Sequence, residues 1–324
     1  MRIWKHTRWD GLLLAFCVGQ LAATLWMATR WAYASAPELV GLFVLLVVMT
    51  VYNIIVVSHL FTHVPWFVSP RLNAIVSTLN SVNIGQSVQA YRLSHVGNHH
   101  RFNNDPKGPD GRTRDTSSTY LLGTDGEHAP LPRYAIGGAL DSLLDRGREL
   151  LAVIRLWRVG PNERQLLALA SKREQRRATE LRQVRADRSA HCLSLVVFAA
   201  LSWQWTLACY LPAFFVALTM VNVQNYYRHY GANPGSRMAD AVSYYGRLYN
   251  LLTFNDGYHQ EHHLSPSTHW SRMPELRERY RERLDAQPRI VSPVPAMVGF
   301  LHTGRPLLHR ATTCGSGATV RRMS

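Results

Sequence analysis

Residues 39–63 read LVGLFVLLVVMTVYNIIVVSHLFTH, an unbroken apolar run that ends in two histidines four positions apart. A helix needs about 20 apolar residues to cross the roughly 30 Å of hydrocarbon in a bilayer. We therefore expect residues 39–57 to span a membrane. His59 and His63 then lie where the helix enters water, and their spacing places both imidazoles on one helical face.

Two further apolar runs extend this pattern. Residues 12–32 form a second span, which does not resemble a signal peptide because it is long and is soon followed by another span. Residues 193–223 are too long for one untilted span, so we expect two tilted helices joined near Tyr210–Pro212. The predicted fold is an all-α membrane protein with four transmembrane helices in two hairpins and a helical cytosolic cap that holds a di-metal site.

These spans divide the chain into five segments. We expect a first hairpin, a first cap segment, a second hairpin, a second cap segment and a disordered tail, at residues 1–58, 59–192, 193–224, 225–303 and 304–324. The first cap segment is predicted to contain a loop, an amphipathic interfacial helix, and a helix opened by Pro161 that runs through a charged stretch, at residues 101–132, 139–157 and 161–188.

The chain is strongly basic, with 36 Lys and Arg residues against 21 Asp and Glu and a formal net charge of +15. No nucleic-acid-binding motif accompanies this charge, so an anionic membrane lipid is the expected partner and nucleic acid is not. The positive-inside bias places both termini and the middle segment in the cytoplasm, as in a multi-pass protein of a bacterial inner membrane. The four cysteines have no close spacing, which excludes an obvious iron–sulfur module.

The histidines are the most informative residues, because nine of the 15 fall into four clusters beside the cytoplasmic ends of spans or in the polar region that follows. Neutral imidazole is a ligand for iron, zinc and copper, and one tetrahedral zinc takes only about four ligands, so nine favour two metals. The clustered residues are His59, His63, His95, His99, His100, His229, His259, His262 and His263.

Other metal signatures do not fit. The sequence contains no HExxH motif, and it lacks the paired Glu-x-x-His motifs of soluble di-iron bundles. The six remaining histidines show no such pattern and are expected to be ordinary interfacial or hydrogen-bonded residues; His269, which closely follows the last cluster, is the least certain of them. They are His6, His128, His191, His269, His302 and His309.

The stretch NDGYHQEHHLSPSTHWSRMPEL at residues 255–276 and the stretch HHRFNND at residues 99–105 resemble the membrane fatty-acid desaturase and hydroxylase superfamily. This resemblance implies four transmembrane helices, an oxygen-activating di-iron centre and an acyl chain held in a narrow tunnel. The three residues between His59 and His63, and the three before the pair His99–His100, are also similar to membrane alkane monooxygenases. In those enzymes an acidic residue usually precedes the histidine that corresponds to His229, whereas this chain has Arg228 at that position.

The resemblance assigns roles to named residues. The nine clustered histidines are the expected ligands of two iron ions, and Asn225, one turn before His229, is a candidate weak ligand. Asp105, Asp256 and Glu261 are candidate acceptors for imidazole N–H groups, which would fix the orientation of the rings. We expect no catalytic residue beyond the metal centre.

The expected function is O2-dependent desaturation of a fatty-acyl chain, with electrons from an external donor such as a ferredoxin and its reductase. The arginine-rich face is suited to dock an acidic donor. The alternatives are a fatty-acid or alkane hydroxylase, and a fatty-acid decarboxylase that forms terminal alkenes. A non-enzymatic membrane metal-binding protein is disfavoured, because the clusters lie in the polar parts of the chain rather than at mid-membrane.

Overall fold

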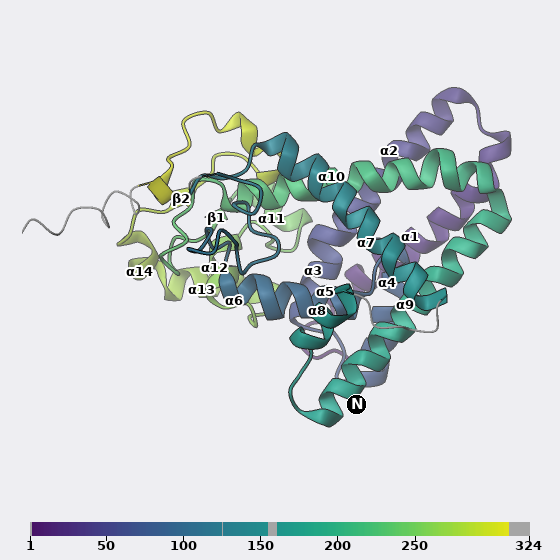
Figure 1. Cartoon of the computed structure of the whole chain (residues 1–324), viewed down its shortest axis with the longest axis horizontal. Coiled ribbons are helices and arrows are strands. Elements are labelled where there is room, and N and C mark those ends of the chain that lie inside the picture. Colours follow the sequence, from purple (N-terminus) through teal and green to yellow (C-terminus); the bar gives the residue numbers. More distant parts are fainter. Residues whose placement is uncertain (1, 125, 155–160, 311–324) are drawn as a thin grey trace, which may run out of the picture. The chain divides into compact units, whose positions relative to one another are not determined.

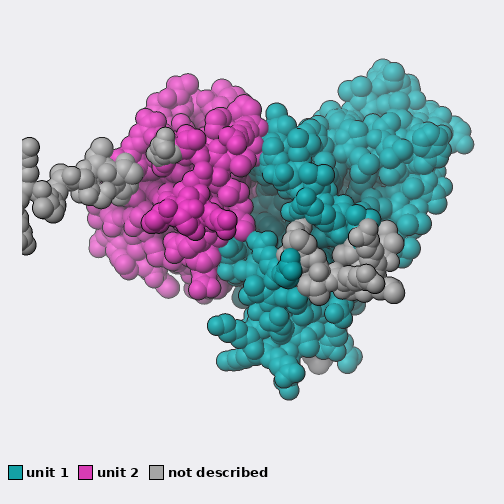
Figure 2. All heavy atoms as spheres, viewed as in Figure 1, with its two compact units in different colours: residues 1–98, 135–222 teal, residues 99–134, 223–324 magenta. Residues whose placement is uncertain are grey.

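The structure is a computed structural model and describes residues 2–124, 126–154 and 161–310. Its elements are predominantly helices (Figure 1), as expected for an all-α chain. The chain divides into two compact units, each built from two separate stretches of sequence (Figure 2). Unit 1 comprises residues 1–98 and 135–222, and unit 2 comprises residues 99–134 and 223–324.

Unit 1 contains the long helices. Its first stretch forms α1 (Asp10–Arg30), η1 (Trp31–Tyr33), α2 (Ala36–Tyr52), η2 (Asn53–Ser58), α3 (His59–His63), α4 (Pro70–Ile84), α5 (Val88–Ser94) and the start of η3 (His95–His99). Its second stretch forms most of η4 (Arg133–Gly137), α7 (Gly138–Ile154), α8 (Pro161–Leu169), α9 (Glu174–Trp205), η5 (Thr206–Tyr210) and most of α10 (Leu211–His229).

Three helical stretches are long and apolar enough to cross a membrane: Asp10–Tyr33, Ala36–His63 and Glu174–His229. The first two contain the spans predicted at residues 12–32 and 39–57. The third is 56 residues long. It bends at Ser202, where the backbone is extended (φ −163°, ψ 101°), and not at Tyr210–Pro212 as predicted. The π-helical turn η5 ends at Tyr210, one turn or less before Pro212, and its wider spacing gives the proline ring room that a regular helix denies it.

The charged helix expected to begin at Pro161 is two helices. α8 ends at Leu169, and α9 begins at Glu174. Ser171 lies in the turn between these helices, and its backbone N–H donates a hydrogen bond of 2.8 Å to the buried carboxylate of Glu180 on α9. This contact holds the connecting turn in place. The amphipathic helix predicted at residues 139–157 matches α7, and its last three predicted residues lie outside the described ones.

A buried amide network joins α1, η2 and α4 inside unit 1. The Asn53 side chain donates to Gln20 at 2.6 Å and to Asn80 at 2.8 Å, and it accepts from the hydroxyl of Ser58 at 2.8 Å. Asn53 opens the π-helical segment that leads into α3. Because polar groups in an apolar surrounding must be hydrogen-bonded, this network fixes how η2 delivers α3 and its two histidines.

A second buried anchor holds α4 and the start of α5 against α9. The carboxylate of Asp187 accepts hydrogen bonds from the hydroxyls of Ser77 and Ser87 at 3.0 and 2.9 Å, and from the backbone N–H of Gln89 at 3.1 Å. Gln183, one turn earlier on α9, donates to the same carboxylate at 2.7 Å. The start of the helix that leads to His95 is therefore tied to a fully buried charge.

Unit 2 is mostly loops and short helices. Its elements are α6 (His100–Phe102), α11 (Arg247–Leu252), α12 (His259–Leu264), η6 (Trp270–Arg272), α13 (Met273–Arg279), α14 (Arg281–Asp285), η7 (Ala296–Leu301), and the parallel strands β1 (Val242–Ser243) and β2 (Ile290–Val291). A loop fills most of the stretch predicted as one at residues 101–132.

The segment expected to be disordered from residue 304 begins with residues that pack. The Arg305 guanidinium donates to the carbonyl of Tyr227 at 2.7 Å, and the backbone N–H of Leu308 donates to Gly231 at 2.7 Å. The disorder was predicted from the small, polar and basic residues of this segment, and composition carries no information about such contacts. The rest of that predicted tail, residues 311–324, lies outside the described residues.

Candidate metal centre

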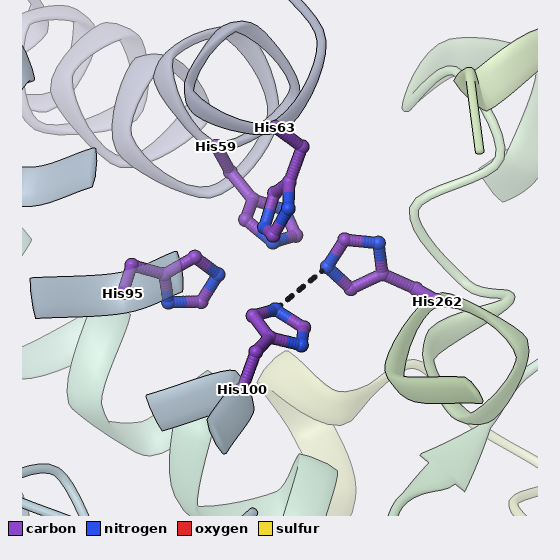
Figure 3. Close-up of side chains that lie close together, drawn as sticks. All are labelled: His59, His63, His95, His100 and His262. Atoms are coloured by element: carbon purple, nitrogen blue, oxygen red, sulfur yellow. Dashed lines mark hydrogen bonds between the residues drawn. The ribbon is translucent and has the colours of Figure 1, made fainter. Parts of the chain in front are cut away.

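Unit 1 brings together three of the predicted ligands. His59 and His63 lie one turn apart on α3, and His95 is the first residue of η3. Their ring centroids are 4.8 to 5.0 Å from one another, and one nitrogen from each falls within 4.8 Å of the others (Figure 3). The predicted shared face of His59 and His63 is thus seen in the structure, with a third imidazole added from another element.

Unit 2 brings together three more: His99, His229 and His263. All three are buried, and one nitrogen from each lies within 4.8 Å of the others. They come from η3, α10 and α12. His99 faces this triad from the π-helical turn η3, where successive side chains project in other directions than on a regular α-helix.

The remaining three clustered histidines are His100, His259 and His262. Each has a ring nitrogen close to a ring nitrogen of another histidine. The Nε2 atoms of His100 and His262 are 3.1 Å apart, and the dashed line in Figure 3 marks this contact. The Nε2 atoms of His259 and His229 are 3.4 Å apart. Two imidazole nitrogens that share one metal ion at about 2.0–2.1 Å, as on zinc, lie roughly 3 Å apart at a right angle. Both spacings suit shared coordination as well as an N–H···N hydrogen bond.

His263 supplies the best internal test of whether these residues fit a metal. Its side chain is completely buried, and neither ring nitrogen makes a hydrogen bond within the described part of the chain. Burial, together with the neighbouring histidines, holds the pKa of His263 well below its usual range, so the ring is neutral. A neutral, buried imidazole with unused nitrogens is costly unless an ion binds it, so the donor set fits a metal.

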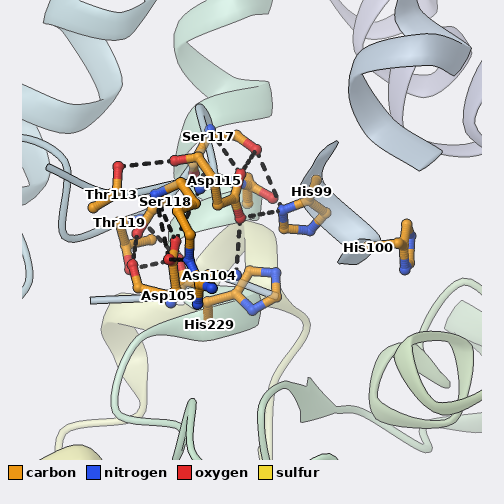
Figure 4. A network of polar contacts seen from close by, with 12 residues as sticks. His99, His100, Asn104, Asp105, Thr113, Asp115, Ser117, Ser118, Thr119 and His229 are labelled. Carbon is orange, nitrogen blue, oxygen red and sulfur yellow. Dashed lines mark hydrogen bonds and ion pairs between the residues drawn. The ribbon is translucent and has the colours of Figure 1, made fainter. Parts of the chain in front are cut away.

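The orientation of His99 is fixed by an acid that the sequence analysis missed. Its Nδ1 lies 2.7 Å from the Oδ2 of Asp115, and both side chains are buried (Figure 4). Burial alone would raise the pKa of Asp115, but His99 and the N–H and hydroxyl groups of Ser117 hold it well below its usual range. The carboxylate is therefore charged and accepts the Nδ1 proton, which leaves Nε2 for a metal.

A backbone group orients His229 in the same manner. Its Nδ1 is 3.2 Å from the carbonyl oxygen of Asp240 and donates to it, which leaves Nε2 as the lone-pair nitrogen. No sequence signal could have revealed this contact, because any residue at position 240 offers the same carbonyl. Asp115 does have a weak signal, as an acid in a loop that directly follows a histidine cluster.

The three acids predicted as acceptors for imidazole N–H groups have the following contacts in the structure. Asp105 accepts from the backbone N–H of Asp115 at 2.9 Å and pairs with Arg114, so it supports Asp115. The two others bind arginines and tyrosines: Asp256 contacts Arg228 and Tyr249, and Glu261 contacts Arg277, Tyr245 and Ser243. These carboxylates hold the framework around the histidines.

Asn225 was proposed as a weak ligand. Its amide nitrogen donates to the hydroxyl of Tyr134 at 2.6 Å, and that hydroxyl donates in turn to the carbonyl of Ser117 at 2.8 Å. Since the amide nitrogen is used in this way, the side-chain oxygen is the atom left for a metal or a water.

Among the histidines outside the clusters, His128 and His269 have clear structural roles. His128 uses both ring nitrogens, Nδ1 with the hydroxyl of Thr119 at 2.7 Å and Nε2 with the backbone N–H of Gly231 at 3.0 Å. His269 caps η6, with its Nδ1 accepting from Ser271.

Comparison with known proteins agrees with this geometry. The family model "Fatty acid desaturase" matches residues 35–293, which cover all nine clustered histidines. The chain therefore belongs to the fatty acid desaturase family, and the expected membership of that superfamily is confirmed.

Shorter matches to individual proteins point the same way. The chain is 42% identical over 78 residues to a sphingolipid delta(4)-desaturase of Candida albicans, a stretch that covers 22% of this chain and 21% of that protein. It is 35% identical over 82 residues to a sphingolipid delta(4)-desaturase of Komagataella phaffii, over 25% of this chain and 22% of that protein. The chain thus matches about a fifth of the length of these relatives.

Proposed function

We propose that this protein is an O2-dependent desaturase that introduces a double bond into the alkyl chain of a lipid. The single observation that carries the proposal is His263, a buried neutral imidazole with two unused nitrogens, within a family of desaturases. Removing hydrogen from an unactivated carbon needs an oxidant that side chains cannot supply, and two iron ions with O2 and external electrons supply it.

The proposed ligands are the nine clustered histidines, with Asn225 as a weak or water-mediated ligand. Asp115 and the carbonyl of Asp240 support this assignment, because each holds an Nδ1 proton and so directs Nε2 outward. The chain's own part in the reaction is to keep these rings neutral and oriented, and to hold the alkyl chain away from water.

We further propose four membrane-spanning helices, counting the stretches on either side of Ser202 separately, with the histidines on a cytosolic cap. The segment boundaries proposed from the sequence go with this topology. An acidic ferredoxin with its reductase is the proposed electron donor, and the basic surface of the chain is the feature that would recognise it.

The substrate class has two candidates. An ordinary fatty-acyl chain is the first, and a sphingolipid is favoured by the relatives above, whose names specify that lipid. Hydroxylation and decarboxylation to a terminal alkene use the same kind of metal centre and remain the competing outcomes. All four cases differ in the mass of the product or in the lipid class that carries it.

The test is expression in a host with a ferredoxin and reductase, followed by mass analysis of acyl lipids, sphingolipids and volatiles. Loss of two hydrogens from a lipid chain is the expected result. A product heavier by one oxygen would show a hydroxylase instead. Iron analysis of the purified protein separates the two parts of the proposal: His262→Ala should lower the iron content, whereas His302→Ala, outside the clusters, should not.

A further inference from the structure

A cavity of about 500 Å³ lies in unit 1, and the described residues that line it include no histidine. Thr62 and Phe61 line it from α3, Gln89 and Arg92 from α5, and Arg176 from α9; Lys5 lies at its rim, just before α1. Lys5 thus lies just before the first candidate span, and Phe61 and Thr62 lie at the end of the second. In a bilayer, the ends of spans lie near the level of the lipid headgroups.

The lining is cationic. Lys5, Arg92 and Arg176 line the cavity, and Glu180 is the only acid among the described residues that line it. That acid is already engaged, since it pairs with Arg176 at 3.0 Å and accepts from the N–H of Ser171. The cavity consequently has more positive than negative charge, and the remaining charge can attract an anion.

Two lining groups have unused hydrogen-bonding capacity. The Nε of Arg92 donates to the carbonyl of Thr62 at 3.0 Å, which leaves its terminal amino groups for another acceptor. The Arg92 guanidinium is held beside the like charge of Arg176. Burial and this neighbour lower the pKa of Arg92. In addition, the buried Nε2 of Gln89 makes no hydrogen bond within the described residues. A phosphate oxygen would satisfy such donors.

Part of the cavity lining is apolar. Phe61, Phe67 and Val88 line the cavity beside the cations. Val68 also lines it and is 56% exposed, and its N–H donates to the carbonyl of Ile3, which is 58% exposed. These two exposed side chains could contact the hydrocarbon of a lipid whose headgroup lies in the cavity.

We propose that this cavity binds an anionic phospholipid of the surrounding bilayer, with the phosphate on Arg92, Arg176 and Lys5 and an acyl chain along Val68 and Ile3. The site is separate from the histidines and does not depend on the proposed desaturation. It is nevertheless linked to them, because Arg92 bridges from α5 to Thr62, the neighbour of His63. A bound phosphate would fix Arg92 and thereby the spacing of the elements that hold His63 and His95.

The test uses the full-length protein, delipidated in a neutral detergent and titrated with dioctanoyl phosphatidylglycerol in a calorimeter. The expected result is saturable binding of one lipid per chain that weakens with added salt. Dioctanoyl phosphatidylcholine, which has the same chains and no net charge, should bind at least about tenfold more weakly, as expected when the charge-assisted contacts are weakened. Equal binding of the two lipids would overturn the proposal, and so would inorganic phosphate binding as tightly as phosphatidylglycerol.

The residues are tested with matched variants. Arg92→Gln and Arg176→Gln should each weaken phosphatidylglycerol binding about tenfold or more. Arg71→Gln removes the same charge from the exposed surface of α4, outside the cavity, and should leave binding unchanged. If Arg92→Gln fails to fold, as judged by its melting temperature, Lys5→Gln at the exposed rim gives the same readout. An equal loss of binding in Arg71→Gln would contradict a specific site.

Discussion

The Nδ1 of His99 and the Oδ2 of Asp115 are 2.7 Å apart, and both side chains are buried. This contact joins a proposed metal ligand to a loop that has no regular secondary structure. Asp115 is in turn held by Asp105 and Ser117, so the loop at residues 103–119 is organised around one carboxylate (Figure 4). This loop, which the sequence alone suggests is only a connecting segment, therefore supports the candidate metal centre.

We predict that Asp115→Asn lowers metal affinity about 10- to 100-fold, because an amide is a weaker acceptor for the Nδ1 proton and can present its own N–H instead. Iron retained per chain after dialysis against a chelator measures the effect. Asp110→Asn, at an exposed position in the same loop, should retain the wild-type iron content. Unchanged retention in Asp115→Asn would mean that the contact does not support a ligand.

The amide network in unit 1 makes a second prediction. Asn53→Leu should destabilise the protein by about 1–3 kcal/mol, because Gln20, Asn80 and Ser58 lose a buried partner. Thermal melting in detergent measures this loss. Adding Asn80→Leu should cost less than its effect alone, since the two residues share hydrogen bonds. Thr29→Val, on the exposed surface of α1, is the control, and strictly additive losses would argue against a coupled network.

How far the sequence predicted this protein depends on the kind of contact. The apolar runs and the nine histidines were visible because hydropathy and helical spacing are local properties. The pairing of His95 with His59 and His63 required the fold, as did the bend at Ser202, which lies well before the more conspicuous Pro212. Asp105 was chosen for its place beside a histidine cluster, whereas Asp115 makes the contact across a loop.

The burial of His128 in unit 2 leads us to predict that the stability of the fold depends on pH. Burial, together with His309, lowers the pKa of His128 to about 2, against a usual value of 6.5. The pKa of His128 is lower in the folded protein than in the unfolded chain, so below about pH 6.5 the unfolded chain binds a proton that the folded protein does not. The stability that neutral His128 contributes above about pH 6.5 is therefore lost as the pH falls. The loss is at most about 1.4 kcal/mol per pH unit.

Melting curves at pH 7 and pH 5 check this. His128→Gln still offers an acceptor to the N–H of Gly231 but cannot take up the proton, so its melting temperature should fall less than that of the wild type. His6→Gln, at an exposed position, should show the wild-type difference between the two pH values. Equal slopes for His128→Gln and the wild type would show that this residue does not drive the acid sensitivity.

The buried ion pair between Arg228 and Asp256 gives the last prediction. Asp256→Leu leaves the Arg228 guanidinium buried without its charged partner, which costs about 3–5 kcal/mol. The double variant Arg228→Met/Asp256→Leu should recover much of that loss, because no unpaired charge then remains. The exposed pair Arg272–Glu275 is the control: Glu275→Leu should cost less than about 1 kcal/mol. Melting temperature measures all three, and a double variant as unstable as Asp256→Leu would show that the pair itself, and not the stranded charge, stabilises the fold around His229.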